Sequence, residues 1–135
     1  MAATHDEIQA AVTEAVVAAL GVEEDEVTPN ATLLGDLGAE SIDLLDILFR
    51  LERKLGIKIQ ASDLGAYVQG GIPDEEFGNE AGIVNPVGLA HLKKVMPQLN
   101  TDELAGKLEA GKVMSLFTVQ NLVDMVAERA ATKVP

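Results

Sequence analysis

Residues 34–45 read LGDLGAESIDLL and join a glycine-containing loop to the start of an amphipathic segment. The two glycines interrupt regular structure, whereas apolar residues after Ser41 recur at intervals of three and four, as on a helix. The pattern ends at Leu55, and Gly56 then supplies a common residue for a helix end. The sequence therefore predicts a long ordered loop over 22–40 and a helix over 41–55.

This predicted helix has two apolar faces. At roughly 100° per residue, one face gathers the leucines that should reach a core. They are Leu44, Leu48, Leu51 and Leu55. The separate face consists of Ile42, Leu45 and Phe49, with Asp46, Glu52 and Arg53 around it. If the first face is buried, the second is exposed and predicts a partner surface. The alternative is a central helix that is buried on both sides.

Capping signals predict further helices on both sides of this segment. Thr4 and Glu7 fit a capping box that opens a helix ending at Leu20. The later predicted helices are a short one that Ser62 or Asp63 caps, one from Asn85 to Met96, one from Asn100 to Leu108 and a last one that Thr118 caps. A strand is conceivable at 57–59, but no strong strand pair is visible. The predicted fold class is therefore all-α, in a single domain over 1–135.

Acidic residues dominate the first part of the chain. The net charge is −12, and residues 1–49 contain eleven acidic residues but no Lys or Arg. Such a surface repels nucleic acid, which proteins bind through Lys and Arg, and it attracts basic protein surfaces. The alternative is a solvated acidic face that only aids solubility.

Several function classes lack their sequence signals. The chain has no Cys, no phosphate loop, serine elbow or zinc helix, and no apolar run near the roughly 20 residues of a membrane span. His5 and His91 lack neighbouring ligands, so no metal site is predicted. The N-terminus resembles neither a secretion signal nor a transit peptide, so we expect a cytoplasmic protein. From the missing apolar run and catalytic motifs we expect neither membrane insertion nor enzymatic activity.

Ser41 is one of three serines in the chain and stands where the loop becomes the helix. A hydroxyl at this position is expected to be exposed and close to the positive end of the helix dipole. Such a site suits an attached phosphate group. The alternative is that Ser41 only caps the helix, which is a common use of serine.

Residues 37–42, Leu-Gly-Ala-Glu-Ser-Ile, resemble the prosthetic-group attachment region of acyl carrier proteins, whose pattern is approximately Leu-Gly-x-Asp-Ser-Leu before an acidic helix. The resemblance extends through Asp43, Glu52 and residues 56–59, and it resumes at 117–123 with the last helix of the family. Glu40 and Ile42 replace the usual Asp and Leu but keep the charge and the apolar character. These two substitutions leave open whether a dedicated transferase is needed to modify Ser41.

The resemblance implies a 4′-phosphopantetheine arm, transferred from coenzyme A to the Ser41 oxygen as a phosphodiester, which carries acyl groups as thioesters. It also implies partners with basic surfaces, namely a phosphopantetheinyl transferase, acyl synthases and acyltransferases of specialised fatty-acid or lipid biosynthesis, and a monomeric carrier. The residues that would face these partners are Glu40, Ile42, Asp43, Leu45, Asp46, Phe49 and Glu52. A peptidyl or polyketide carrier, and an acidic helical adaptor with no prosthetic group, are the alternatives.

The chain departs from the family in length before its last helix. By resemblance, the fold is a four-helix bundle with one or two extra helices inserted at about 62–113, where ordinary carriers have a short loop and a third helix. We expect the addition either to enlarge the acyl pocket or to form a docking surface of its own. Ser62, in Ala61-Ser62-Asp63-Leu64, is a weak echo of the attachment motif that lacks the preceding glycine loop.

Overall fold

The computed structural model describes residues 4–131, apart from the side chains of Ser41, Ala61 and Ala131. Its longer helices are α1 (His5–Leu20), α2 (Ser41–Leu55), α3 (Ala61–Gln69), α5 (Pro86–Val95) and α7 (Val119–Ala131). Its shorter elements are the single turns α4 (Asp74–Phe77) and α6 (Thr101–Leu104) and the 3₁₀ helices η1 (Glu24–Glu26) and η2 (Ala110–Leu116). Strand pairing in the described residues is limited to three isolated bridges. The all-α prediction is confirmed.

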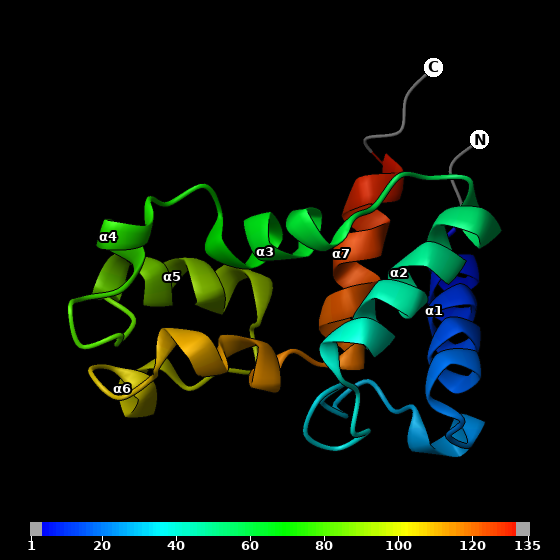
Figure 1. The fold of residues 1–135 in the computed structure, drawn as a ribbon, viewed down its shortest axis with the longest axis horizontal. Coiled ribbons are helices and arrows are strands. Elements are labelled where there is room, and N and C mark those ends of the chain that lie inside the picture. The colour runs from blue at the N-terminus through cyan, green and yellow to red at the C-terminus, as the bar shows by residue number, and fades with distance from the viewer. Residues whose placement is uncertain (1–3, 132–135) are drawn as a thin grey trace.

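The helices form two groups that lie next to each other (Figure 1). Helices α1, α2 and α7 form one group, in which α1 packs on both α2 and α7. Helix α3 leads from this group to the second one, which consists of α4, α5, α6 and η2. We call residues 70–117 the 70–117 segment. One continuous cluster of buried apolar side chains runs through both groups.

The ends of α1 follow from the capping signals in the sequence. The Glu7 backbone N–H donates to Thr4 Oγ1 at 3.1 Å, and the Thr4 N–H donates to Glu7 Oε1 at 3.2 Å. These bonds satisfy two N–H groups that a helix start leaves unpaired. Gly21 ends the helix at a φ of +70°, a conformation that suits glycine. The predicted helix from Thr4 to Leu20 is confirmed, with Thr4 as its cap.

Helix α2 buries one of its two apolar faces. Leu48 and Leu51 are in the core, and Leu44 and Leu55 are partly buried against it. Ile47 is fully buried as well, although the helical pattern did not single it out. Ile42, Leu45 and Phe49 remain exposed, so the alternative of a helix buried on both sides is wrong for this chain.

The segment before and within α3 differs from its prediction. Residues 57–59 form no strand; Ile57 and Ile59 are buried, and the Ile59 N–H donates to Glu52 Oε1 at 3.1 Å. Helix α3 begins at Ala61, so neither Ser62 nor Asp63 is its N-cap. Asp63 instead accepts a hydrogen bond from the backbone N–H of the N-cap residue, Gln60, at 2.8 Å.

Two other capping predictions are confirmed only in part. Asn85 precedes α5 as expected, but its side chain donates to the Glu76 carbonyl at 3.1 Å and does not cap. Asn100 accepts the Glu103 N–H at 3.3 Å, yet α6 ends at Leu104 and not at Leu108. Gly106 follows at a φ of +74°, which helps to end the helix early. The 3₁₀ helix η2 was not predicted.

A buried asparagine connects the two groups of helices. The Asn121 side chain, 1% exposed, accepts the Thr118 N–H at 2.9 Å and donates to the Val95 carbonyl at 3.2 Å. It also bonds the Gln98 side chain, with Gln98 Nε2 donating to Asn121 Oδ1 at 2.7 Å. Thr118 caps α7 as predicted, because its hydroxyl accepts the Asn121 N–H at 3.2 Å. The start of α7 is thereby fixed to the end of α5.

Candidate attachment and docking site

The loop before Ser41 is held in place by contacts with the end of the 70–117 segment. Thr32 pairs with Thr118 in an antiparallel bridge, and the Leu33 N–H donates to the Phe117 carbonyl at 3.1 Å. Leu33 is 1% exposed and anchors the loop in the core. Within the loop, Thr32 and Asp36 exchange two hydrogen bonds of 2.9 Å between backbone N–H groups and side-chain oxygens. These contacts give the start of α2 a defined position.

Ser41 is the first residue of α2 and follows the N-cap residue Glu40. The Glu40 N–H donates to Asp43 Oδ2 at 2.8 Å. Because the N-cap is Glu40, the alternative that Ser41 is the cap is wrong. The Ser41 side chain lies outside the described atoms, so the expected exposure of its hydroxyl stays a prediction.

The surroundings of this backbone position fit a phosphate-linked group. The first N–H groups of an α-helix have no partner within the helix and favour a negative charge. Glu40 and Ile42, on either side of Ser41, are both exposed. A Cβ built on Gly38 would have no atom within 4 Å, so the approach from the loop side is open as well. These exposed neighbours and the open space at Gly38 are compatible with a group attached at this position.

The second apolar face of α2 forms a strip on the surface. Ile42, Leu45 and Phe49 are 70%, 51% and 56% exposed, and we call these three residues the α2 strip. Three large exposed apolar side chains on one helix face are typical of an interaction surface. The structure therefore brings together all three apolar residues that the sequence assigned to a partner.

Three of the four predicted partner acids already have partners inside the chain. Asp43 accepts the Glu40 N–H, Asp46 Oδ1 pairs with Arg50 Nε at 2.9 Å, and Glu52 accepts the Ile59 N–H. The first two carboxylates lie on the α2 surface beside the α2 strip and retain free acceptor sites. Glu52 also fixes the connection to α3, a structural role that its spacing in the sequence did not indicate.

The cluster of basic residues at the other end of α2 was not predicted, although Arg53 was placed beside the second apolar face. Arg50, Arg53 and Lys54 line a groove of about 480 Å³ between α1 and α2. The Arg53 guanidinium carbon lies 5.7 Å from the centroid of the Phe49 ring, a cation–π distance. Their spacing in the sequence could have revealed this cluster, because they are the first basic residues of the chain and lie within two turns.

Two side chains of α3, Asp63 and Tyr67, have pKa values shifted from their ordinary values. The hydrogen bond from the Gln60 N–H holds the pKa of Asp63 below its ordinary value, and the neighbouring Arg129 also lowers it. Arg129 Nη2 lies 2.5 Å from Asp63 Oδ1 and so connects α3 to α7. Burial raises the pKa of Tyr67 to about 12, and the charges of Glu128 and Asp124 add to this effect. These groups belong to packing between helices, away from the start of α2.

Other kinds of site find little support in residues 4–131. No group of His, Asp and Glu there could hold a metal ion. None of the described helices combines the length and the apolar character needed to span a membrane. Ser62 is exposed near the start of α3, and the Ser115 hydroxyl donates to the Lys112 carbonyl at 2.6 Å.

Comparison with known proteins identifies similar sequences over the first half of the chain. A family model described as "Phosphopantetheine attachment site" matches residues 10–67, from α1 into α3. The acyl carrier protein of Thermotoga maritima is 40% identical over 62 residues, which are 46% of this chain and 76% of that protein. No solved structure matches the chain significantly.

Two mycobacterial proteins are also similar. The meromycolate extension acyl carrier proteins of Mycolicibacterium smegmatis and Mycobacterium leprae are 39% and 36% identical, each over 64 residues. These residues are 47% of this chain, and they cover 65% and 56% of the two relatives, respectively. The 70–117 segment lies outside the residues that the family model matches.

Proposed function

Since this chain belongs to the acyl carrier protein family, we propose that it carries acyl groups for partner enzymes on an arm attached to Ser41. Members of the family are carrier proteins and not enzymes, and their cofactor is a covalently attached 4′-phosphopantetheine. When bound, this group supplies the thiol on which acyl thioesters form. The catalytic groups that act on the thioester belong to other proteins.

The single observation that carries the choice of Ser41 is its position at the start of α2. Ser41 is the first residue of the helix. The loop before it is held in place by its contacts with Phe117 and Thr118. The helix N-terminus favours the negative charge of a phosphodiester. Ser62 is the second candidate, because it is exposed near the start of α3 and lies within the matched residues.

Helix α2 would also present the arm to partners. The α2 strip supplies apolar contact area beside the arm, and Glu40, Asp43 and Asp46 supply the negative charge that attracts a basic enzyme surface. Glu52 would contribute indirectly, by fixing the connection between α2 and α3, since its carboxylate accepts a hydrogen bond from the Ile59 N–H. Phosphopantetheinyl transferase, acyl synthases and acyltransferases are the partners that this surface would meet.

For the cargo we propose a fatty-acyl chain of specialised lipid biosynthesis. Support comes from the names of the two mycobacterial relatives, which are carriers for meromycolate extension. A peptidyl or polyketide cargo is the alternative within the family. The 70–117 segment would then serve this specialised cargo or its enzymes, as part of a single domain with an addition at about 62–113. A cytoplasmic location and a monomeric state stay predictions.

The test is the intact mass of the full chain after incubation with coenzyme A and a promiscuous phosphopantetheinyl transferase. Ser41→Ala is compared with the matched control Ser62→Ala. We expect one added phosphopantetheine on the wild type and on Ser62→Ala, and none on Ser41→Ala. Addition to Ser41→Ala but not to Ser62→Ala would move the site to α3. No addition to any of the folded proteins would favour the adaptor alternative or a dedicated transferase, and coexpression with transferases from carrier gene clusters would separate these two.

A further inference from the structure

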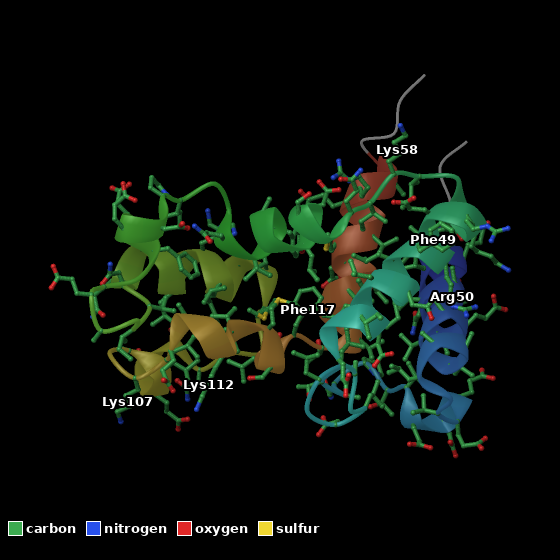
Figure 2. The ribbon with its side chains drawn as sticks, viewed as in Figure 1. Phe49, Arg50, Lys58, Lys107, Lys112 and Phe117 are labelled. Atoms are coloured by element: carbon green, nitrogen blue, oxygen red, sulfur yellow. The ribbon has the colours of Figure 1, made fainter. Side chains whose placement is uncertain are left out.

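The charged side chains of α2 are acidic near its start and mostly basic near its end, where Glu52 is the one acid. Asp43 and Asp46 lie toward the start of the helix, whereas Arg50, Arg53 and Lys54 lie toward its end. Figure 2 shows Phe49 and Arg50 on α2, at the opposite end of the molecule from Lys107 and Lys112. A cationic cluster therefore occupies the end of α2 in a chain whose net charge is −12.

The groove beside these cations has room for a few side chains of a partner helix. It measures about 480 Å³, and Glu14 is the one acidic residue among those that line it. Its α1 side is lined by Ala11, Ala15 and Ala18, of which Ala18 is exposed and the other two are buried and form the floor. A groove between two helices that has an apolar floor and charged edges is typical of sites that bind an amphipathic helix.

The ion pairs inside the groove are weak and can be exchanged. Lys54 Nζ lies 3.1 Å from Glu14 Oε2, and both side chains are more than half exposed. In the Arg50–Asp46 pair beside the groove, the two side chains are 46% and 41% exposed. Such surface pairs contribute about 0–1 kcal/mol, so carboxylates of a partner can replace them at little cost.

Arg53 is the cation most available to a partner. Among the described residues no carboxylate forms an ion pair with it, and its guanidinium lies over the exposed Phe49 ring. The α2 strip therefore leads directly to a cation at the edge of the groove. A partner that covers Phe49 has to meet this positive charge.

We propose that the groove between α1 and α2 binds an acidic amphipathic helix of a partner protein, with the helix carboxylates against Arg50, Arg53 and Lys54. The choice of occupant rests on charge complementarity. Three cations line the groove next to the α2 strip, so a partner helix that contacts the strip is bound best when it places carboxylates against them. The inference deepens the proposed function, since it names the chemistry of one partner class. A partner with a uniformly basic face is repelled at this end of α2 and is thereby selected against.

Two synthetic amphipathic helices test the proposal. They share the same apolar positions, and their charged positions are all Glu in one and all Lys in the other. Each is titrated into the isotope-labelled full-length protein, and backbone amide shifts are followed by NMR. We expect the Glu helix to shift the signals of Ala15, Ala18 and Arg53, and the Lys helix to shift those near Asp43.

Variants then separate the groove from general electrostatics. Arg53→Glu combined with Lys54→Glu should weaken binding of the Glu helix about tenfold or more. Lys112→Glu makes the same type of charge change on η2 and should leave binding unchanged. Ala18→Trp fills the groove without a change of charge and should block binding as well, with the fold of each variant checked by circular dichroism.

Other outcomes would overturn the proposal. These are a Glu helix that leaves the groove signals unshifted, a Lys helix that occupies the groove, or full binding by the Arg53→Glu, Lys54→Glu variant. Groove signals that shift with protein concentration alone would identify a second copy of this chain as the occupant, which also contradicts the proposal. Because Ser41→Ala keeps the groove intact, the titration on this variant distinguishes failure of groove binding from failure of the carrier function.

Discussion

Helices α1, α2 and α7 pack through periodic apolar faces, whereas the 70–117 segment combines its buried apolar residues with turns, single bridges and hydrogen bonds between distant residues. Val12, Val16 and Val126 are fully buried in the first group and come from regular helix faces. In the 70–117 segment, Val84 N donates to the Leu108 carbonyl at 2.8 Å, and Ala110 N donates to the Gly82 carbonyl at 2.8 Å. The contrast teaches that local sequence patterns specify the first group, while the second requires contacts between distant residues.

The largest effect is expected at Phe117, which lies where the two groups meet (Figure 2). Its side chain is 0% exposed, and its carbonyl accepts the Leu33 N–H in the loop before Ser41. Phe117→Ala should lower the free energy of unfolding by about 3–5 kcal/mol, because it leaves a large cavity. Chemical denaturation followed by circular dichroism measures this loss. A loss below about 1 kcal/mol would show that the two groups are stable independently.

Asn121→Ala tests whether side-chain hydrogen bonds join the groups. The substitution leaves the Val95 carbonyl, the Gln98 side chain and the Thr118 N–H without their partner. We expect a loss of about 3 kcal/mol, with faster hydrogen exchange in α5 than in α1. Gln120→Ala is the matched control, because Gln120 is partly exposed and bonds Asp124 within α7. Equal losses in the two variants would contradict the role of Asn121.

Gly70→Ala should disturb the 70–117 segment without reaching α1. Gly70 has a φ of +68°, and a Cβ at this position would overlap the His91 ring. The ring cannot move away freely, since His91 Nε2 lies 2.9 Å from the Tyr67 carbonyl oxygen. We expect a loss of about 2–3 kcal/mol. Gly71→Ala is a sharp control, because its φ of +78° is similar but the space around it is empty. Thermal unfolding of both variants gives the cost of the overlap as their difference, which would be zero if His91 yields.

A smaller effect is expected for Asp63, which ties α3 to α7 through Arg129. Because the folded-state pKa of Asp63 is lowered, its carboxylate stabilises the fold above the ordinary value of 3.8. This stabilisation is lost as the pH falls below that value. Asp63→Asn should therefore be less stable than the wild type at neutral pH, and the difference should shrink toward pH 3, as measured by denaturant titration at each pH. A difference independent of pH would contradict this assignment.

The smallest effect concerns Tyr67 at high pH. Its pKa is raised from 10.0 to about 12, so the neutral phenol stabilises the fold below pH 10, and this contribution is lost as the pH rises from 10 to 12. Tyr67→Phe cannot ionise and should lose less stability than the wild type over this range. Thermal unfolding at the two pH values measures the difference. Parallel losses in both proteins would assign the effect to other groups.

The sequence predicts the first group well because its signals are local. Thr4 with Glu7, Thr118 at the start of α7, and the exposed face of Ile42, Leu45 and Phe49 all follow from spacing within a few residues. Ile47 was not singled out, although at roughly 100° per residue it lies about 40° from Leu51 and extends the buried face on the side away from the α2 strip. The Ser41 position was predicted from the same local pattern, and the family is confirmed by the comparisons.

The rest of the fold and site could not be predicted, because it depends on residues far apart in the sequence. Asn121 bonds Gln98 and Val95, which lie 23 and 26 residues away. Asn85 matches a helix cap in the sequence, but the packing of α4 on α5 directs its side chain to the Glu76 carbonyl. The basic groove exists only because α1 places alanines beside Arg50, Arg53 and Lys54.

The bridge between Thr32 and Thr118 has a consequence for the order of folding. Helices α1 and α2 are close in sequence and can pair early, whereas α7 reaches its place only after the whole 70–117 segment has been accommodated. The entropic cost of closing such a connection grows slowly, by about 0.6 kcal/mol for each doubling of its length. A chain of this design can therefore acquire a long excursion before its last helix at a small thermodynamic cost, and the main consequence is slower folding.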